Sequence, residues 1–296
     1  MANTPQNEDT LRGFGFALSA YLLWGFLPLY LKLVGHIPAV EVVAHRVIWS
    51  IPVAGLVLIL LRRTGDLGRV LRDPKALMMG CLTAALVSVN WGTYVWTIAA
   101  DRALDGALGY YINPIFSVFL GAMLLGEKPN KLQWAAVGLA AGAVGVLTVA
   151  NGSLPWPALV LTTSWGFYAY FKRALPIGPN QGFLLEVLIL SPFALGYLIW
   201  LGGQGGGHFV PLSLDMWLLM GCGVVTAVPL MLYANGAKGL RLATIGIMQY
   251  IAPTMIMLLA VFVFEEPFGT ARAIAFPMIW AALALYTYAM FRNRKS

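Results

Sequence analysis

Charged residues are scarce in this chain, making up only 10% of its 296 residues, whereas a soluble domain carries roughly a quarter. Apolar and aromatic residues make up 59%. A water-soluble globule of this composition would have too few polar groups to cover its surface. The composition therefore excludes an ordinary soluble protein and predicts an integral membrane protein that is solvated by the lipid bilayer.

Cysteine and histidine are also rare. Cys81 and Cys222 each lie in an apolar run, so we expect neither a disulfide framework nor a metal cluster. His36, His45 and His208 are too scattered to form a metal-binding motif, and the sequence has no Walker lysine loop, GxSxG turn or HExxH motif. We therefore predict a protein that is not an enzyme, with no catalytic or metal-ligating residues and no cofactor.

What the sequence does contain is a series of long apolar runs. Each is too long and too uniformly apolar to be an alternating barrel strand, so we predict transmembrane α-helices. No small-residue cleavage site follows the first run, so we expect it to be a span and not a removable signal. The ten predicted helices cover residues 13–34, 40–61, 76–99, 104–125, 132–150, 154–172, 182–201, 214–236, 242–264 and 271–291.

The basic residues give the orientation of these helices. Ten spans place 15 of the 19 Lys and Arg residues on the side of the two termini, leaving Lys32, Arg46, Arg102 and Arg272 elsewhere. Because cytoplasmic segments are enriched in Lys and Arg, both termini are predicted to be cytoplasmic. The net charge of +7 is spread over short connecting segments and not gathered in one stripe, so we expect no nucleic-acid partner.

The two halves of the sequence resemble each other. Trp24-Gly25-Phe26 recurs as Trp165-Gly166-Phe167, and Tyr111-Ile112-Asn113-Pro114 recurs as Tyr250-Ile251-Ala252-Pro253. Glu127 corresponds in the same way to Glu266. Because five is an odd number of spans, a duplicated five-helix unit is inserted upside down relative to the first copy. We therefore predict an all-α integral membrane fold with ten transmembrane helices as two inverted five-helix repeats.

This organisation gives four segments and a mechanism. The predicted segments are a cytoplasmic N-terminal tail (1–12), the first repeat (13–150), the second repeat (151–291) and a basic C-terminal tail (292–296). When the repeats exchange shapes, a site between them opens to the other side of the membrane, which is typical of an alternating-access carrier. Pro114 and Pro253 occupy equivalent positions in the repeats and are candidate hinges.

Aromatic and amide side chains at membrane depth are the candidate substrate-binding residues. Asn90 and Tyr94 share a helix face, and each repeat contributes a Trp-Gly helix and a Tyr-x-x-Pro helix. A cavity of this kind carries no strong fixed charge and suits a neutral or zwitterionic solute. The residues that we place there are Trp24, Asn90, Tyr94, Tyr111, Trp165 and Tyr250.

Three ionisable residues near the start of the second predicted helix are further candidates. Glu41 and His45 share one face and Arg46 points elsewhere. Glu41 and His45 either contact the substrate or join helices at the outer interface. His45 titrates near neutral pH, so the sequence leaves open whether transport is proton-coupled or facilitative.

Several of these segments resemble a known family. Residues 24–30 (WGFLPLY), 41–50 (EVVAHRVIWS), 108–114 (LGYYINP) and 249–254 (QYIAPT) are similar to the RarD branch of the drug/metabolite transporter (EamA) superfamily, and the chain also resembles the YddG-type bacterial amino-acid exporters of that superfamily. The resemblance covers residues 13–291. It implies a multi-pass carrier of the bacterial inner membrane that exports small metabolites.

We expect the cargo to be a neutral, preferentially large or aromatic amino acid. The alternative is efflux of a drug of the chloramphenicol type or of another metabolite. A more remote alternative is an intramembrane enzyme, for which Asp101 and Asp105 have the spacing of a metal-binding pair; we interpret them as solvated loop residues. The oligomeric state stays open.

Overall fold

A computed structural model describes residues 9–292 apart from 63–64, 66–67, 69–70, 127 and 174, and leaves out the side chains of residues 242–243 and 290–292. Residues 1–8 of the predicted N-terminal tail, residues 293–296 of the C-terminal tail, and Glu127 of the repeat comparison lie outside the described residues.

Helices make up the fold, and no strand occurs in the ranges that the structure describes. The helices are α1 (Leu11–Leu33), α2 (Ala39–Leu60), α4 (Pro74–Ala99), α5 (Ala103–Leu124), α6 (Lys131–Asn151), α7 (Trp156–Lys172), α8 (Pro179–Gly203), α9 (Leu214–Gly236), the 3-10 helix η1 (Ala237–Gly239), α10 (Leu242–Met248), α11 (Ile251–Phe262) and α12 (Gly269–Arg292).

These helices confirm the prediction of an all-α multi-pass membrane protein. Within the described residues, nine helical stretches are long and apolar enough to cross a membrane, with α10 and α11 counted as one stretch. The remaining helix, α7, has 17 residues and packs between α4 and α5. Large apolar side chains such as Phe193, Ile199 and Phe262 are at least 73% exposed on the bundle surface, where lipid would solvate them.

Local sequence signals explain where several helices begin and end. The Thr10 hydroxyl accepts a hydrogen bond from Gly13 N (3.0 Å) at the start of α1. Asn130 and Gln133 form a reciprocal capping box at the start of α6, and the same helix ends at Gly152 in the left-handed conformation (φ 66°). Pro74 opens α4 at a position where its missing N–H costs nothing.

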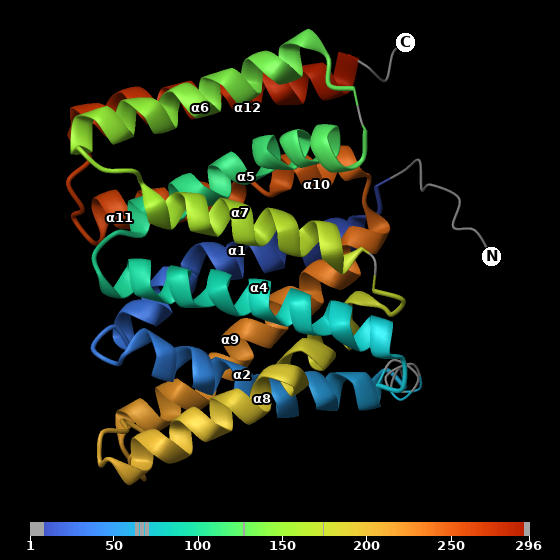
Figure 1. Ribbon diagram of the computed structural model, residues 1–296, viewed down its shortest axis with the longest axis vertical. Helices are drawn as coiled ribbons and strands as arrows, with labels where there is room; N and C mark the ends of the chain where they lie inside the picture. Colours follow the sequence, from blue (N-terminus) through green and yellow to red (C-terminus); the bar gives the residue numbers. More distant parts are fainter. Residues whose placement is uncertain are drawn as a thin grey trace.

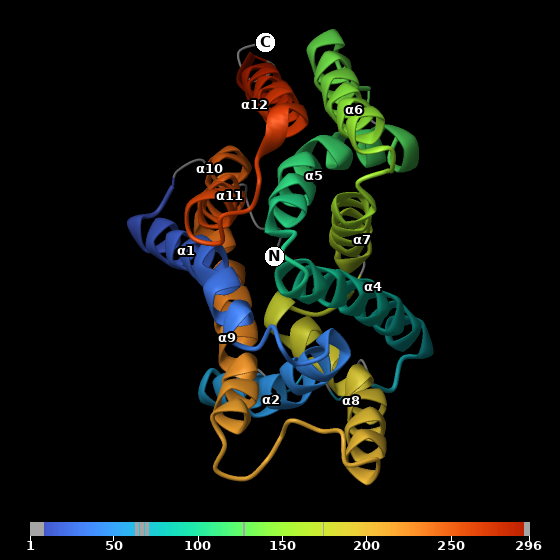
Figure 2. The same cartoon turned by 90° about the vertical axis from the view of Figure 1, so that its left-hand side faces the viewer.

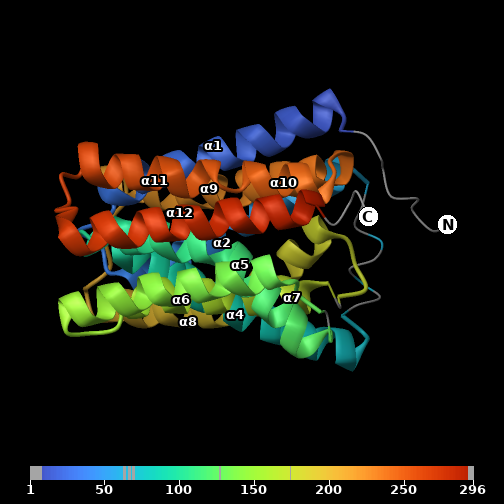
Figure 3. The same cartoon turned by 90° about the horizontal axis from the view of Figure 1, so that it is seen from above.

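The helices lie roughly along one common direction and form two walls (Figures 1 and 3). Figure 2 shows α1, α9, α10 and α11 on one side and α4, α5 and α7 on the other. α6 packs against α12 at one extremity of the bundle, and α2 packs against α8 at the other. Each wall therefore combines helices from both halves of the sequence.

The ninth predicted helix, 242–264, is broken in the structure. α10 ends at Met248, and α11 starts at Ile251 after a turn at Gln249 and Tyr250. Pro253 explains the position of the break, because proline lacks the N–H that would bond to the Gln249 carbonyl and its ring crowds that carbonyl. The equivalent Pro114 lies inside α5, which is continuous.

The start of α1 and the end of α12 lie at the same end of the bundle (Figures 1 and 3), which we call the terminal end. At the opposite end, Lys32 of α1 pairs with Asp101, and Tyr30 donates to the Leu218 carbonyl of α9. The Glu266 carboxylate there accepts hydrogen bonds from two backbone N–H groups at the start of α5. Polar contacts thus join several helices at the opposite end.

Candidate functional site: a cavity between the two walls

A cavity of about 130 Å³ lies between the two walls of the bundle. Helices α1, α2, α4, α5, α7, α9 and α11 contribute to it, together with Gln249 of the α10–α11 turn. Its lining residues are Tyr21, Trp24, Leu27, Arg46, Asn90, Trp91, Tyr94, Tyr110, Asn113, Trp165, Thr226, Leu230, Tyr233, Gln249, Ala252, Pro253 and Ile256. The cavity brings together four of the predicted substrate-binding residues, namely Trp24, Asn90, Tyr94 and Trp165, and it also includes the candidate hinge Pro253.

Aromatic rings form much of the cavity wall. Trp24 of α1 packs against Tyr21 and against Tyr233 of α9, with ring centroids 5.7 and 5.5 Å apart. Trp165 of α7 lines the cavity from the other wall. The two residues of the repeated Trp-Gly motif therefore face one cavity from opposite walls, and the cavity offers flat apolar surfaces to a ligand.

Asn90 organises the polar side of the cavity. It is 1% exposed, and its amide donates to the Leu161 carbonyl and to Ser164 Oγ of α7, both at 3.1 Å. Its carbonyl accepts a hydrogen bond from Tyr110 Oη of α5 at 3.2 Å. Asn90 therefore links α4 with α5 and α7, and both polar atoms of its side chain take part in the protein's own hydrogen bonds.

Three other polar atoms of the cavity lining have no such partner. Tyr94 Oη, Asn113 Oδ1 and Arg46 Nη1 are buried without a hydrogen-bond partner among the described residues. Because an unpaired buried polar group is costly, these three atoms are the places where a polar group of a ligand would be stabilised.

Arg46 corrects the prediction that the cavity has no strong fixed charge. Its side chain is 3% exposed and lines the cavity from α2. Arg46 Nε donates to Thr226 Oγ1 of α9 at 3.0 Å, and Arg46 Cζ lies 5.1 Å from the centroid of the Trp91 ring. The sequence placed Arg46 on a different face from Glu41 and His45, but it did not reveal that this face is turned toward the cavity.

Tyr111 and Tyr250, also predicted substrate-binding residues, lie outside this cavity. They line a separate groove between α5, α10, α11 and α12, together with Thr254 and Trp280. Tyr111 Oη is 2.7 Å from Thr254 Oγ1. Their neighbours along the chain, Tyr110 and Gln249, face the cavity instead. For Tyr110 the reason is that adjacent residues of a helix point about 100° apart.

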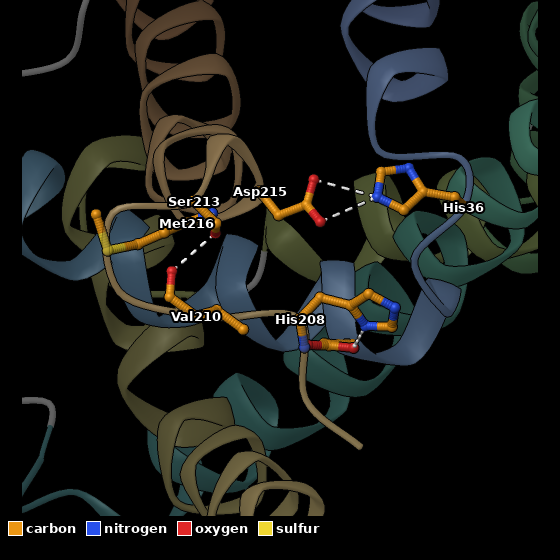
Figure 4. Close-up of polar contacts among 7 residues, drawn as sticks. His36, His208, Val210, Ser213, Asp215 and Met216 are labelled. Atoms are coloured by element: carbon orange, nitrogen blue, oxygen red, sulfur yellow. Dashed lines mark hydrogen bonds and ion pairs between the residues drawn. The ribbon is translucent and has the colours of Figure 1, made fainter. Parts of the chain in front are cut away.

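Glu41 also lies outside the cavity, near the connection between α8 and α9. It is buried and accepts a hydrogen bond from His208 N at 2.7 Å, with Oε2 2.8 Å from His208 Nδ1. Beside this pair, His36 Nε2 lies 3.1 Å from both carboxylate oxygens of Asp215 (Figure 4). These contacts join α2 and the α1–α2 connection to the α8–α9 connection and the start of α9. Of the two interpretations offered by the sequence, this position of Glu41 fits a residue that joins helices.

His45 lines the same peripheral pocket as Glu41. Its ring stacks on Phe209 with centroids 5.0 Å apart, and Trp49 Nε1 donates to His45 Nδ1 at 3.3 Å. The central cavity is therefore separate from the pocket that contains both Glu41 and His45.

The structure also adds cavity residues that the sequence analysis missed. Tyr21 precedes Trp24 by one helical turn, and Thr226 and Tyr233 lie on one face of α9. Helical spacing from Trp24 would have pointed to Tyr21. No comparable signal existed for Thr226, because its position depends on the packing of α9 against α2.

Asp101 and Asp105 do not form a joint site. Asp101 pairs with Lys32, whereas the Asp105 carboxylate is 2.6 Å from Arg102 and 3.6 Å from Arg272. Asp105 is only 6% exposed, so the interpretation of both residues as solvated was wrong for Asp105. Its ion pairs with two arginines make its burial tolerable.

Comparisons with known proteins agree with this architecture. The model of the EamA-like transporter family matches residues 11–149. An "Uncharacterized transporter" of Vibrio cholerae is 40% identical, with 97% of this chain and 95% of that protein covered. "Protein RarD" of Streptomyces exfoliatus is 39% identical (99% and 92% covered), and "Chloramphenicol-sensitive protein RarD" of Pseudomonas aeruginosa is 30% identical (93% of each covered).

A solved structure, described only as "Crystal structure of protein", has the same fold. It superposes with a TM-score of 0.62 at 20% identity and covers 96% of this chain and 99% of that chain.

Proposed function

Because the chain belongs to the EamA-like transporter family and is related to its RarD members along nearly its whole length, we propose that it exports neutral, preferentially aromatic amino acids by alternating access. The observation that carries this proposal is the central cavity. Trp24, Trp91 and Trp165 offer flat apolar surfaces to an aromatic side chain, and Tyr94 Oη and Asn113 Oδ1 offer polar atoms without partners.

The packing of the helices supports the proposed mechanism. The first, third and fourth helices of the first repeat are α1, α4 and α5, and their counterparts in the second repeat are α7, α9 and the α10–α11 pair. If each helix is replaced by its counterpart, one wall of the bundle becomes the other. The same exchange relates α2 to α8 and α6 to α12, two pairs that pack together. This is the arrangement expected of two inverted repeats over 13–150 and 151–291, whose exchange of shapes would open the cavity to either side.

The orientation is part of the proposal. The start of α1 and the end of α12 share the terminal end of the bundle. The excess of Lys and Arg on that side supports a cytoplasmic location for both termini in the bacterial inner membrane. Transport from the terminal end to the opposite end would then be export.

The direct test is exchange of labelled phenylalanine, leucine and threonine by purified protein in liposomes. We expect phenylalanine flux well above that of empty liposomes. Trp165→Ala should abolish it, whereas Trp200→Ala, at a residue that is 59% exposed on the bundle surface, should retain it. If none of the three amino acids is taken up above the level of empty liposomes, the proposed cargo class is wrong.

The second candidate function is drug or other metabolite efflux, because one relative is called "Chloramphenicol-sensitive protein RarD". Overexpression that raises chloramphenicol tolerance without changing amino-acid release would favour it. Flux measured with and without an imposed pH gradient would decide between proton-coupled and facilitated transport.

A further inference from the structure

The inference concerns Arg46, a positive charge in the middle of an otherwise uncharged cavity. Arg46 lies seven residues after the start of α2, about 10 Å along the helix. Its side chain is 3% exposed, so it does not reach water at the end of the bundle. The guanidinium instead spans the cavity side of α2, between Thr226 of α9 and Trp91 of α4.

Among the residues that the structure describes, no carboxylate forms an ion pair with Arg46, so its charge has no counter-ion there. The carboxylates of the elements packed around α2 are engaged elsewhere: Glu41 with His208, Glu186 with Lys172, and Asp215 with His36. The residues that line the cavity together with Arg46 include no Asp or Glu.

The guanidinium also keeps unused donors. Nε is bound to Thr226, but Nη1 is buried and has no hydrogen-bond partner. The contact with the Trp91 ring offsets part of the cost of burying the charge, but it occupies none of these donors. An uncompensated buried charge with free donors is expensive, and a carboxylate is the group whose two oxygens match the guanidinium fork.

We propose that Arg46 binds the carboxylate of the cargo and restricts transport to solutes that carry one. This inference rests on the proposed carrier function and deepens it. The rest of the cavity fits the same class of solute, because Asn113 Oδ1 is an unpartnered acceptor and Trp24 and Trp165 provide the apolar surface. An amino acid offers a carboxylate, a donor group and an apolar side chain, whereas its amide derivative lacks the carboxylate.

The test compares an acid with its amide on the wild-type protein. Isothermal titration calorimetry of the purified protein would use phenylalanine, phenylalaninamide and 3-phenylpropionate. We expect both carboxylates to bind at least about 30-fold more tightly than the amide, as for truncation of one partner of a buried charge pair. Equal affinity for the acid and the amide would overturn the proposal without any variant.

Variants then assign the effect to Arg46. Arg46→Gln should reduce the preference for the acid over the amide to within a few-fold, and Arg46→Lys should keep part of it, because lysine retains the charge but not the planar fork. Arg12→Gln, at the exposed start of α1, is the control and should bind like the wild type. A folded Arg46→Gln protein that retains the wild-type preference would contradict the assignment. If that variant does not fold, Arg46→Lys and the wild-type comparison still decide.

Failure of this inference differs from failure of the proposed function. If the liposomes exchange phenylalanine and phenylalaninamide equally well, the carrier proposal stands and the role of Arg46 is wrong. If 3-phenylpropionate binds in an Arg46-dependent manner but no amino acid is transported, the carboxylate site stands and the amino-acid cargo is wrong.

Discussion

Replacing Asn90 with alanine tests whether the polar side of the cavity is held together as the structure indicates. The side chain makes three hydrogen bonds, to Leu161, Ser164 and Tyr110. Side-chain hydrogen bonds between membrane helices contribute roughly 0.6 kcal/mol each, so Asn90→Ala should lower the free energy of unfolding by roughly 2 kcal/mol. Tyr110→Phe removes one of the three bonds and should cost roughly 0.6 kcal/mol.

The assay is reversible unfolding in mixed micelles, monitored during titration with a denaturing detergent. In the double variant Asn90→Ala/Tyr110→Phe, the hydrogen bond between the two side chains is already lost through Asn90→Ala, so Tyr110→Phe should not lower the free energy of unfolding further. The two changes should therefore show a coupling energy of roughly 0.6 kcal/mol. Ser88→Ala is the control on the same helix, because its exposed hydroxyl bonds only to its own helix at Ala85. The reasoning is refuted if Asn90→Ala is no more destabilising than Ser88→Ala, or if the effects of Asn90→Ala and Tyr110→Phe are additive.

Three further changes test other parts of the fold by the same unfolding measurement. Gly223→Ala would drive Cβ into the Trp49 backbone carbonyl of α2 and should destabilise by about 1–3 kcal/mol, whereas Gly55→Ala meets open space and should change little. Hydrogen bonds from Arg241 hold the pKa of Asp9 well below its usual range, so the ionised Asp9 carboxylate stabilises the folded protein at neutral pH. This contribution to the free energy of unfolding should be lost as the pH falls below about 4, and the Asp9→Asn variant should not show this pH dependence. Burial raises the pKa of Glu266, so protonation favours the folded state and stability should rise on acidification toward pH 4.5, a trend that Glu266→Gln should abolish.

The helices were predictable because lipid imposes a strong and local constraint. A segment must satisfy its own backbone and remain apolar over about 20 residues to cross the membrane, and both properties are visible in a single run of sequence. The predicted runs 13–34 and 214–236 therefore lie within a few residues of α1 and α9. The break before Pro253 was not predicted, because proline is compatible with a continuous membrane helix, as Pro114 in α5 demonstrates.

Placement in the cavity was predictable for some residues and not for others. Trp24 and Trp165 occupy equivalent positions in the two predicted repeats and both face the cavity. Tyr111 and Tyr250 are equally well matched in sequence, yet both turn into the groove beside α12. A repeat makes two positions equivalent to each other but does not say which face of a helix meets the partner wall.

By itself, the sequence determined the membrane class, the approximate limits of most helices and the resemblance to a transporter family, because each of these depends on composition, local hydropathy or short motifs. Only the tertiary structure decided that the isolated charge of Arg46 lies in the central cavity while Glu41 pairs with His208 at its periphery. The physical reason is that burial and charge compensation are set by side chains from helices distant in the sequence. Thr226 and Trp91 contact the guanidinium from two different helices, and neither supplies a negative charge.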